Sequence, residues 1–180
     1  ALMMVIGTVV GLGSVVIWRQ VANRLGTKKV WIVGKFFLCA GALRLAFLSP
    51  GDAVFLDIMW AYILFKLGIM AGGISAPALL SDLIDYSNWK FKTECTASYY
   101  GLFTLITKVF LALGSALGIM IVGWYGFDPA SPVYTDETIF AVHLALGWLP
   151  VLFFLMAVLF VWFIPINTQR HSIIRQRLDS

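Results

Sequence analysis

The chain has 180 residues, of which 61% are hydrophobic and only 12% are charged, and its formal net charge is +4. Its mean hydropathy is +0.90, and an ordinary soluble domain carries about twice as many charged residues. This number of charged residues is too small to solvate the surface of a soluble domain. The composition therefore excludes a soluble fold and predicts an integral membrane protein.

The hydrophobic residues gather in five runs of roughly 18–28 residues, a length that crosses about 30 Å of hydrocarbon. None of the runs shows the alternation of a membrane β-strand, so an all-α membrane protein is expected. Pro77 and Pro150 fall inside two of the runs and predict bends. In chain order the predicted spans are about 1–18, 30–49, 53–80, 98–125 and 138–165, followed by a tail at 166–180.

Glycines recur at spacings of four residues in three of the predicted spans. Such spacings let helix backbones approach closely where lipid provides no hydrophobic drive. Close helix contacts are therefore expected at Gly7, Gly11, Gly13, Gly68, Gly72, Gly73, Gly114 and Gly118.

Basic residues alternate between the connections that join the spans. The first connection, 18–29, carries Arg24 and three other basic residues, the second carries none, the third is basic, the fourth is acidic, and the tail is basic. Cytoplasmic segments of membrane proteins are enriched in lysine and arginine. The pattern places 18–29, 82–97 and 166–180 in the cytoplasm of a multi-pass protein of the plasma membrane (the cell inner membrane).

Five spans with a cytoplasmic C-terminus put residue 1 on the outer side, inside a hydrophobic run. Nothing at the start resembles the charged region or the cleavage site of a secretory signal. The chain is therefore expected to be a fragment of a longer protein.

Motifs of catalysis, metal binding and nucleic-acid binding are absent from the sequence. Cys39 lies in a span and Cys95 in a connection, so neither a disulfide nor a metal site is expected. There is no His-Glu-x-x-His, no Gly-x-Ser-x-Gly and no phosphate-binding glycine loop. The basic clusters are short and are explained by topology. We therefore expect no enzyme, no cofactor and no nucleic-acid partner.

Five charged side chains interrupt the apolar spans, where an unpaired charge costs a few kcal/mol or more. Arg44 and Asp57 lie near the outer ends of their spans and Lys35 lies near an inner boundary, where long side chains reach the interface. Lys66 and Lys108 lie deeper, so each needs a partner or a water-filled cavity.

Lys108 lies about ten residues into the fourth span, and Thr104 and Thr107 precede it within about one turn. We expect these three residues to line a polar cavity. Lys66 and Ser75 on the third span are further candidates for that cavity, and a place in helix packing is the alternative.

The most informative stretch runs from Ser81 to Lys90, where the third span ends. Its pattern, Asp82-x-x-Asp85-Tyr86-x-x-Trp89-Lys90, is followed by a span with Thr104-x-x-x-Lys108. This arrangement resembles the glycoside–pentoside–hexuronide:cation symporters, the melibiose permease family of the major facilitator superfamily. The connection 18–29 and the tail are similar to the same family, so the resemblance covers the whole chain.

The resemblance implies a twelve-helix transporter in which the five spans are helices eight to twelve. Helix seven and the N-terminal half, with the principal cation site, would be missing. It also implies alternating access in the bilayer, with Na⁺ or H⁺ driving the symport of a sugar or glycoside.

The resemblance further implies roles for individual residues. Lys108 matches a family lysine close to the cation and sugar sites. Asp82 and Asp85 match acidic residues that pair with basic side chains at an inward gate, for which Lys90 and Arg24 are the candidates; a solvated helix end is the alternative.

The sequence also departs from the family pattern. Members commonly follow Trp-Lys with a glycine and then an arginine, whereas this chain has Lys92 and Glu94 there. The sequence therefore does not decide which ion pairs form the gate or which substrate is carried. The spans contain few polar side chains. A transporter of the same fold that carries a lysolipid, a drug or another organic solute is therefore an alternative. A structural membrane subunit is another.

Overall fold

The computed structural model describes residues 2–48, 54–128, 130 and 135–163. The predicted tail at 166–180 lies outside these residues, as do the middle of the second connection and most of 129–134. All regular elements in the described part of the chain are helices, as predicted. They are α1 (Leu2–Leu25), α2 (Thr27–Ala46), α3 (Val54–Phe91), α4 (Thr96–Trp124), α5 (Asp136–His143), the π-helical turn η1 (Leu144–Trp148) and α6 (Leu149–Phe163).

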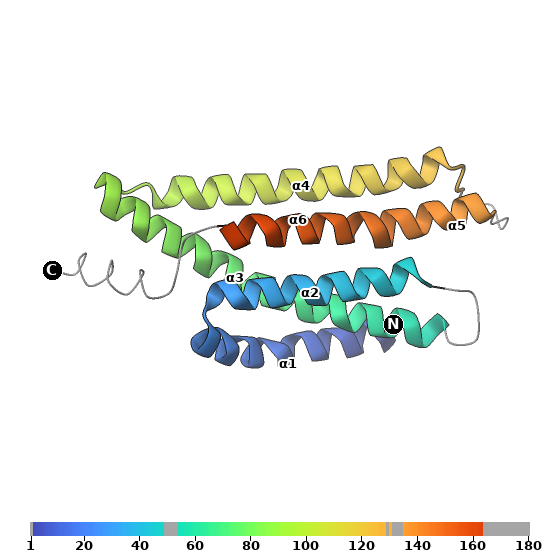
Figure 1. The fold of residues 1–180 in the computed structure, drawn as a ribbon, viewed down its shortest axis with the longest axis horizontal. Coiled ribbons are helices and arrows are strands. Elements are labelled where there is room, and N and C mark those ends of the chain that lie inside the picture. The colour runs from blue at the N-terminus through green and yellow to red at the C-terminus, as the bar shows by residue number, and fades with distance from the viewer. Residues whose placement is uncertain (1, 49–53, 129, 131–134, 164–180) are drawn as a thin grey trace.

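The helices form one bundle in which α2 lies between α3 and α6 (Figure 1). Helix α1 flanks α3, while α4 lies beside the continuous stretch of α5, η1 and α6. The α1–α2 and α3–α4 connections lie at the same end of the bundle. We call this the basic end, because it carries Arg24, Lys28, Lys29, Lys90 and Lys92.

Four helical stretches of the described chain are long and apolar enough to cross a membrane: Met3–Leu25, Val54–Phe91, Thr96–Trp124 and Asp136–Phe163. Helix α2 is not among them, because Lys28, Lys29, Lys35 and Arg44 lower its apolar character. It nevertheless packs against α3 and α6 within the bundle, at the place of the second predicted span.

Helix α3 is longer than the apolar run that predicted it. The run ends near residue 80, but the helix continues to Phe91 and has 38 residues, with Pro77 inside it. Most of the segment 82–97, expected to be a connection, is therefore helical. Only residues 92–95 separate α3 from α4, and Lys92 makes the turn with a positive φ of 50°.

Pro150 produces the irregularity expected in the last span. Proline has no N–H to donate to the carbonyl of Leu146, and its ring crowds that carbonyl. The helix widens just before it: residues 144–148 form a π-turn, and the N–H of Leu149 donates to the carbonyl of Leu144. Such single π-turns are a recognised way of absorbing a helix irregularity.

Small residues set the distance between α2 and α3, the most extensive interface of the bundle. A Cβ on Gly34 would lie 2.6 Å from the Cβ of Ala71, and a Cβ on Gly68 would lie 2.7 Å from the carbonyl oxygen of Gly34. The prediction of close contacts is confirmed at Gly68, and also at Gly7, which faces the ring of Tyr62.

Several other glycines have no such close contact within the described residues. In that part of the chain, nothing lies within 4 Å of a Cβ built on Gly13, Gly72, Gly73, Gly114 or Gly118. A glycine spacing therefore identified helices that can approach closely, but not which of their faces do so.

Candidate functional site

Lys108 lies in the exposed middle of α4. Every residue from 100 to 117 is exposed, and α4 has no buried residue. Thr104 lies one turn before Lys108 on the same face of the helix, whereas the hydroxyl of Thr107 donates to the carbonyl of Phe103 at 2.7 Å. The structure thus presents an ammonium and a hydroxyl on a helix face that the described residues leave uncovered.

Lys66 and Ser75 occupy packing positions on α3. The ammonium of Lys66 lies 5.2 Å from the ring centroid of Tyr62, and the Cβ of Lys66 lies beside Gly11 of α1. Ser75 is fully buried and its hydroxyl donates to the carbonyl of Ala71 at 2.6 Å. These contacts are compatible with a packing role for both residues, and their place in a polar cavity stays a prediction.

The candidate gate residues lie at the basic end. Asp82, Asp85 and Lys90 are in the last three turns of α3, and Arg24 is exposed in the last turn of α1. The ammonium of Lys90 lies 5.4 Å from the ring centroid of Phe91 on its own helix. The pairing of these acidic and basic residues remains a prediction.

Two tyrosine–serine hydrogen bonds, which the sequence did not signal, join α3 and α4 at the same end. Tyr99 bonds Ser87 at 2.9 Å between hydroxyl oxygens, and Tyr100 bonds Ser81 at 2.8 Å. Because the Ser81 hydroxyl donates to the carbonyl of Pro77, Tyr100 is the donor to Ser81. These bonds attach the first turn of α4 to the part of α3 that carries the aspartates.

An ion pair joins α2 and α3 at the opposite end of the bundle. The guanidinium of Arg44 on α2 bonds the carboxylate of Asp57 on α3. Each residue had been interpreted alone, as a side chain reaching the outer interface. Their partnership depends on the hairpin of α2 and α3, which brings together two positions 13 residues apart.

The two partners of this pair should contribute to stability jointly. We expect Arg44→Ala and Asp57→Ala each to cost about 0.2–1 kcal/mol, because the two side chains are 51% and 30% exposed and solvent screens pairs of this kind. The double variant should be more stable than the sum of the two losses predicts. Thermal unfolding of the purified protein measures this, with Arg19→Ala, an exposed arginine on α1, as the control. If the loss of stability in the double variant equalled the sum of the two single losses, the two side chains would not interact.

Lys35 is partly buried and contacts aromatic rings on two helices. Its ammonium lies 4.8 Å from the ring centroid of Trp31 on α2 and 5.4 Å from that of Phe154 on α6. Cation–π contacts of this kind replace part of the lost hydration. They account for a lysine within an apolar bundle without assigning it to transport.

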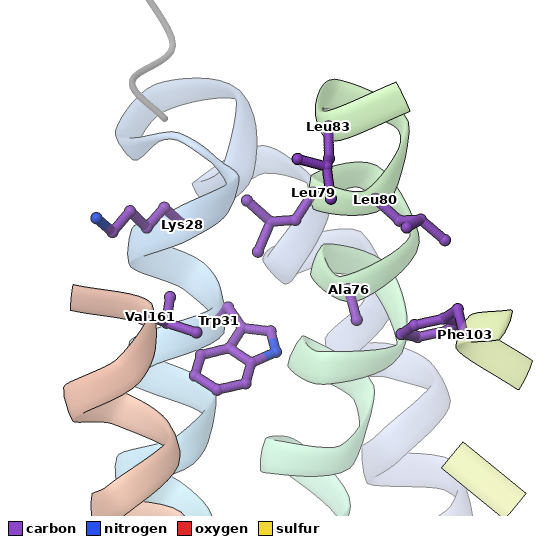
Figure 2. Close-up of a pocket in the computed structure, with 8 residues that line it drawn as sticks. All are labelled: Lys28, Trp31, Ala76, Leu79, Leu80, Leu83, Phe103 and Val161. Carbon is purple, nitrogen blue, oxygen red and sulfur yellow. The ribbon is translucent and has the colours of Figure 1, made fainter. Parts of the chain in front are cut away.

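An apolar cavity of about 260 Å³ lies between α2, α3, α4 and α6 (Figure 2). Lys28 is its one charged lining residue; the remaining lining residues are Trp31, Ala76, Leu79, Leu80, Leu83, Phe103 and Val161. The Lys28 ammonium donates to the carbonyl oxygen of Trp162, near the end of α6, at 3.0 Å. In Figure 2 this ammonium points away from the indole of Trp31.

A second cavity of about 570 Å³ lies between α4 and the α5–η1 stretch. Gly114, Gly118 and Gly123 form its α4 wall, with Ser115 as the polar exception among apolar neighbours. Residues 2–48, 54–128, 130 and 135–163 contain no group of three or more His, Cys, Asp or Glu side chains that could hold a metal ion.

The family model described as MFS/sugar transport protein matches residues 1–168 of the chain. The chain belongs to this family. Membership confirms the expected class: an all-helical, multi-pass membrane protein related to transporters and not to enzymes. No solved structure matches the chain.

Three curated relatives match nearly the whole chain. An uncharacterized symporter of Synechocystis is 26% identical, with 91% of this chain and 31% of the relative covered. A glucuronide carrier protein homolog of Escherichia coli is 23% identical, with 87% and 34% covered. An uncharacterized symporter of Bacillus subtilis is 28% identical, with 92% and 35% covered. The chain of this MFS family member thus spans about a third of the length of these relatives.

Proposed function

We propose that the chain is the C-terminal part of a secondary active transporter that moves a sugar or glycoside together with Na⁺ or H⁺ by alternating access. The observation that carries the proposal is Lys108, an ammonium on the uncovered middle of an apolar helix in a member of the MFS/sugar transport family. Intramembrane charges are expensive and mark solute or ion pathways. The relatives' names, two symporters and a glucuronide carrier homolog, support the same reading.

In this proposal α4 faces the solute pathway. Lys108 and Thr104 contact the solute or lie beside the coupling cation, and Thr107 supports the same stretch of helix. The uncovered residues 100–117 pack against the N-terminal half, which also supplies the principal cation site. Rocking of the two halves then exposes the site to each side in turn.

The basic end faces the cytoplasm of the cell in this proposal, and the C-terminus lies on the same side of the plasma membrane. Its excess of lysine and arginine supports the orientation. Asp82 and Asp85 then lie where the inward gate closes, with Lys90 and Arg24 as candidate partners. The tyrosine–serine bonds couple that part of α3 to α4, so a movement of the gate would reach the helix that carries Lys108.

A second candidate keeps the mechanism and changes the cargo to a lysolipid, a drug or another organic solute. The two cavities support it, since both are lined almost entirely by apolar residues. A sugar site needs several hydrogen-bonding groups, whereas the Ser75 hydroxyl already donates to the carbonyl of Ala71 on its own helix.

Uptake assays test the proposal. Cells that express the full-length protein are given radiolabelled sugars, including a glucuronide, in Na⁺-containing and Na⁺-free buffers at two pH values. We expect accumulation that follows one of the two ion gradients and collapses when that gradient is abolished. Absence of sugar accumulation from a well-expressed protein would contradict sugar transport, and lipids and organic anions would then be tested as the cargo.

A further inference from the structure

The cavity of Figure 2 has the lining of a hydrocarbon site. Apart from Lys28, its walls are aliphatic or aromatic side chains contributed by α2, α3, α4 and α6. A polar solute that entered it would lose hydrogen bonds to water without replacing them, at a cost of several kcal/mol. In a protein that crosses a bilayer, the abundant ligand without that cost is a lipid acyl chain.

The α2 side of the rim of this cavity carries basic side chains, while Asp82 and Asp85 flank the lining residue Leu83 on α3. The stem of Lys28 forms part of the wall, while its ammonium lies toward the end of α6, bonded to the carbonyl oxygen of Trp162. Lys29 and Arg24 are exposed in the neighbouring turns. Lysine and arginine close to a membrane surface attract anionic headgroups by about 1 kcal/mol each.

We propose that this cavity binds an anionic phospholipid. One acyl chain lies among Ala76, Leu79, Leu80 and Phe103, and the phosphate lies at the rim beside Lys28. The lipid bridges α2, α3, α4 and α6, so it stabilises the contact of α4 with the rest of the bundle at the basic end. This site is separate from Lys108 and does not depend on the identity of the transported solute.

Charge complementarity favours this occupant over another protein segment. The cavity is a pocket between membrane helices with Lys28 as its single charged lining residue. An acyl chain with a phosphate at one end matches both the apolar depth and the cationic rim. Phosphatidylcholine also carries a phosphate, but its choline cation cancels that charge, so its headgroup matches the cationic rim less well.

Lipid binding to the purified full-length protein tests the proposal. Delipidated protein in detergent is titrated with phosphatidylglycerol or phosphatidylcholine, and bound lipid is counted by native mass spectrometry together with the melting temperature. We expect phosphatidylglycerol to bind more tightly and to raise Tm by a few degrees. Equal binding of the two lipids would overturn the proposal.

Adjacent lysines provide a matched pair of variants. Lys28→Gln should weaken phosphatidylglycerol binding roughly fivefold, whereas Lys29→Gln should change it less than twofold, because Lys29 is exposed and does not line the cavity. Equal effects of the two variants would indicate general attraction to a basic surface and would overturn the site.

Two further measurements separate the acyl chain from the phosphate. Leu83→Trp narrows the cavity at a residue that is 40% exposed, so the fold tolerates it; it should weaken binding of both lipids. Glycerol phosphate should not compete with phosphatidylglycerol, and competition would reassign the site to a free phosphate. Uptake assays are not needed for any of these results, so failure here is distinct from failure of the transport proposal.

Discussion

Replacing Lys108 with alanine should lower solute uptake by the full-length protein about 10- to 100-fold and leave the amount of protein in the membrane unchanged. A hydrogen bond from a charged donor is worth about 1.5–3 kcal/mol, which corresponds to this loss of apparent affinity. Folding should be spared, because the side chain lies on the middle of α4, where every residue from 100 to 117 is itself exposed in the described chain.

Initial uptake rates, divided by the amount of protein in the membrane, measure this effect. Lys92→Ala removes an exposed lysine from the α3–α4 connection, outside the stretch 100–117. This control should keep uptake within about twofold, since surface substitutions of this kind have small effects. If Lys108→Ala instead lowered the membrane level in step with uptake, the lysine would have a structural role.

Enlarging Gly68 should disrupt the bundle more than any other single change considered. A Cβ at this position would lie 2.6 Å from the side chain of Leu38 and 2.7 Å from the carbonyl oxygen of Gly34, so Gly68→Leu must force α2 and α3 apart. Overpacking a core costs about 1–3 kcal/mol, and contact with backbone leaves little room for relaxation. We expect a much lower Tm and little protein in the membrane.

Gly72→Leu is the matched control for this prediction. Gly72 lies one turn further along α3, and no described residue is within 4 Å of a Cβ built there. Thermal stability in detergent and the membrane level should therefore stay close to those of the unmodified protein. Equal loss of stability in both variants would show that α3 tolerates no side chain at either glycine, and the close approach of α2 and α3 would not be the cause.

The candidate site was only partly readable from the chain. Lys108 with Thr104 was predicted, because an ammonium in an apolar run and a neighbour at i−4 are local features that hydropathy and helical spacing reveal, and their place in a solute site stays a prediction. Ser75 was a further candidate for the same cavity. Its burial against the turn that contains Ala71 depends on how α3 is rotated toward its neighbours, and no local pattern specifies that rotation.

Contacts between helices were the main omission. Arg44 and Asp57 were considered separately, although each is the other's partner, and Tyr99 and Tyr100 carried no signal at all. Such pairs form where two helix faces meet. The apolar sequence allows many different faces to meet, so it does not specify which residues become partners. Lys35 shows the same limitation, since one of its two aromatic neighbours lies on α6, more than one hundred residues away.

The sequence by itself determined the class of the protein, the order of its helices and the basic end of its bundle. These follow from the length of apolar runs and the alternation of charge, which the chain carries locally whatever its packing. Only the tertiary structure decided that α3 continues to Phe91, that Gly68 rather than Gly72 meets α2, and that an apolar cavity lies beside Lys28. These features depend on the rotation and crossing of whole helices, which close packing between distant residues determines.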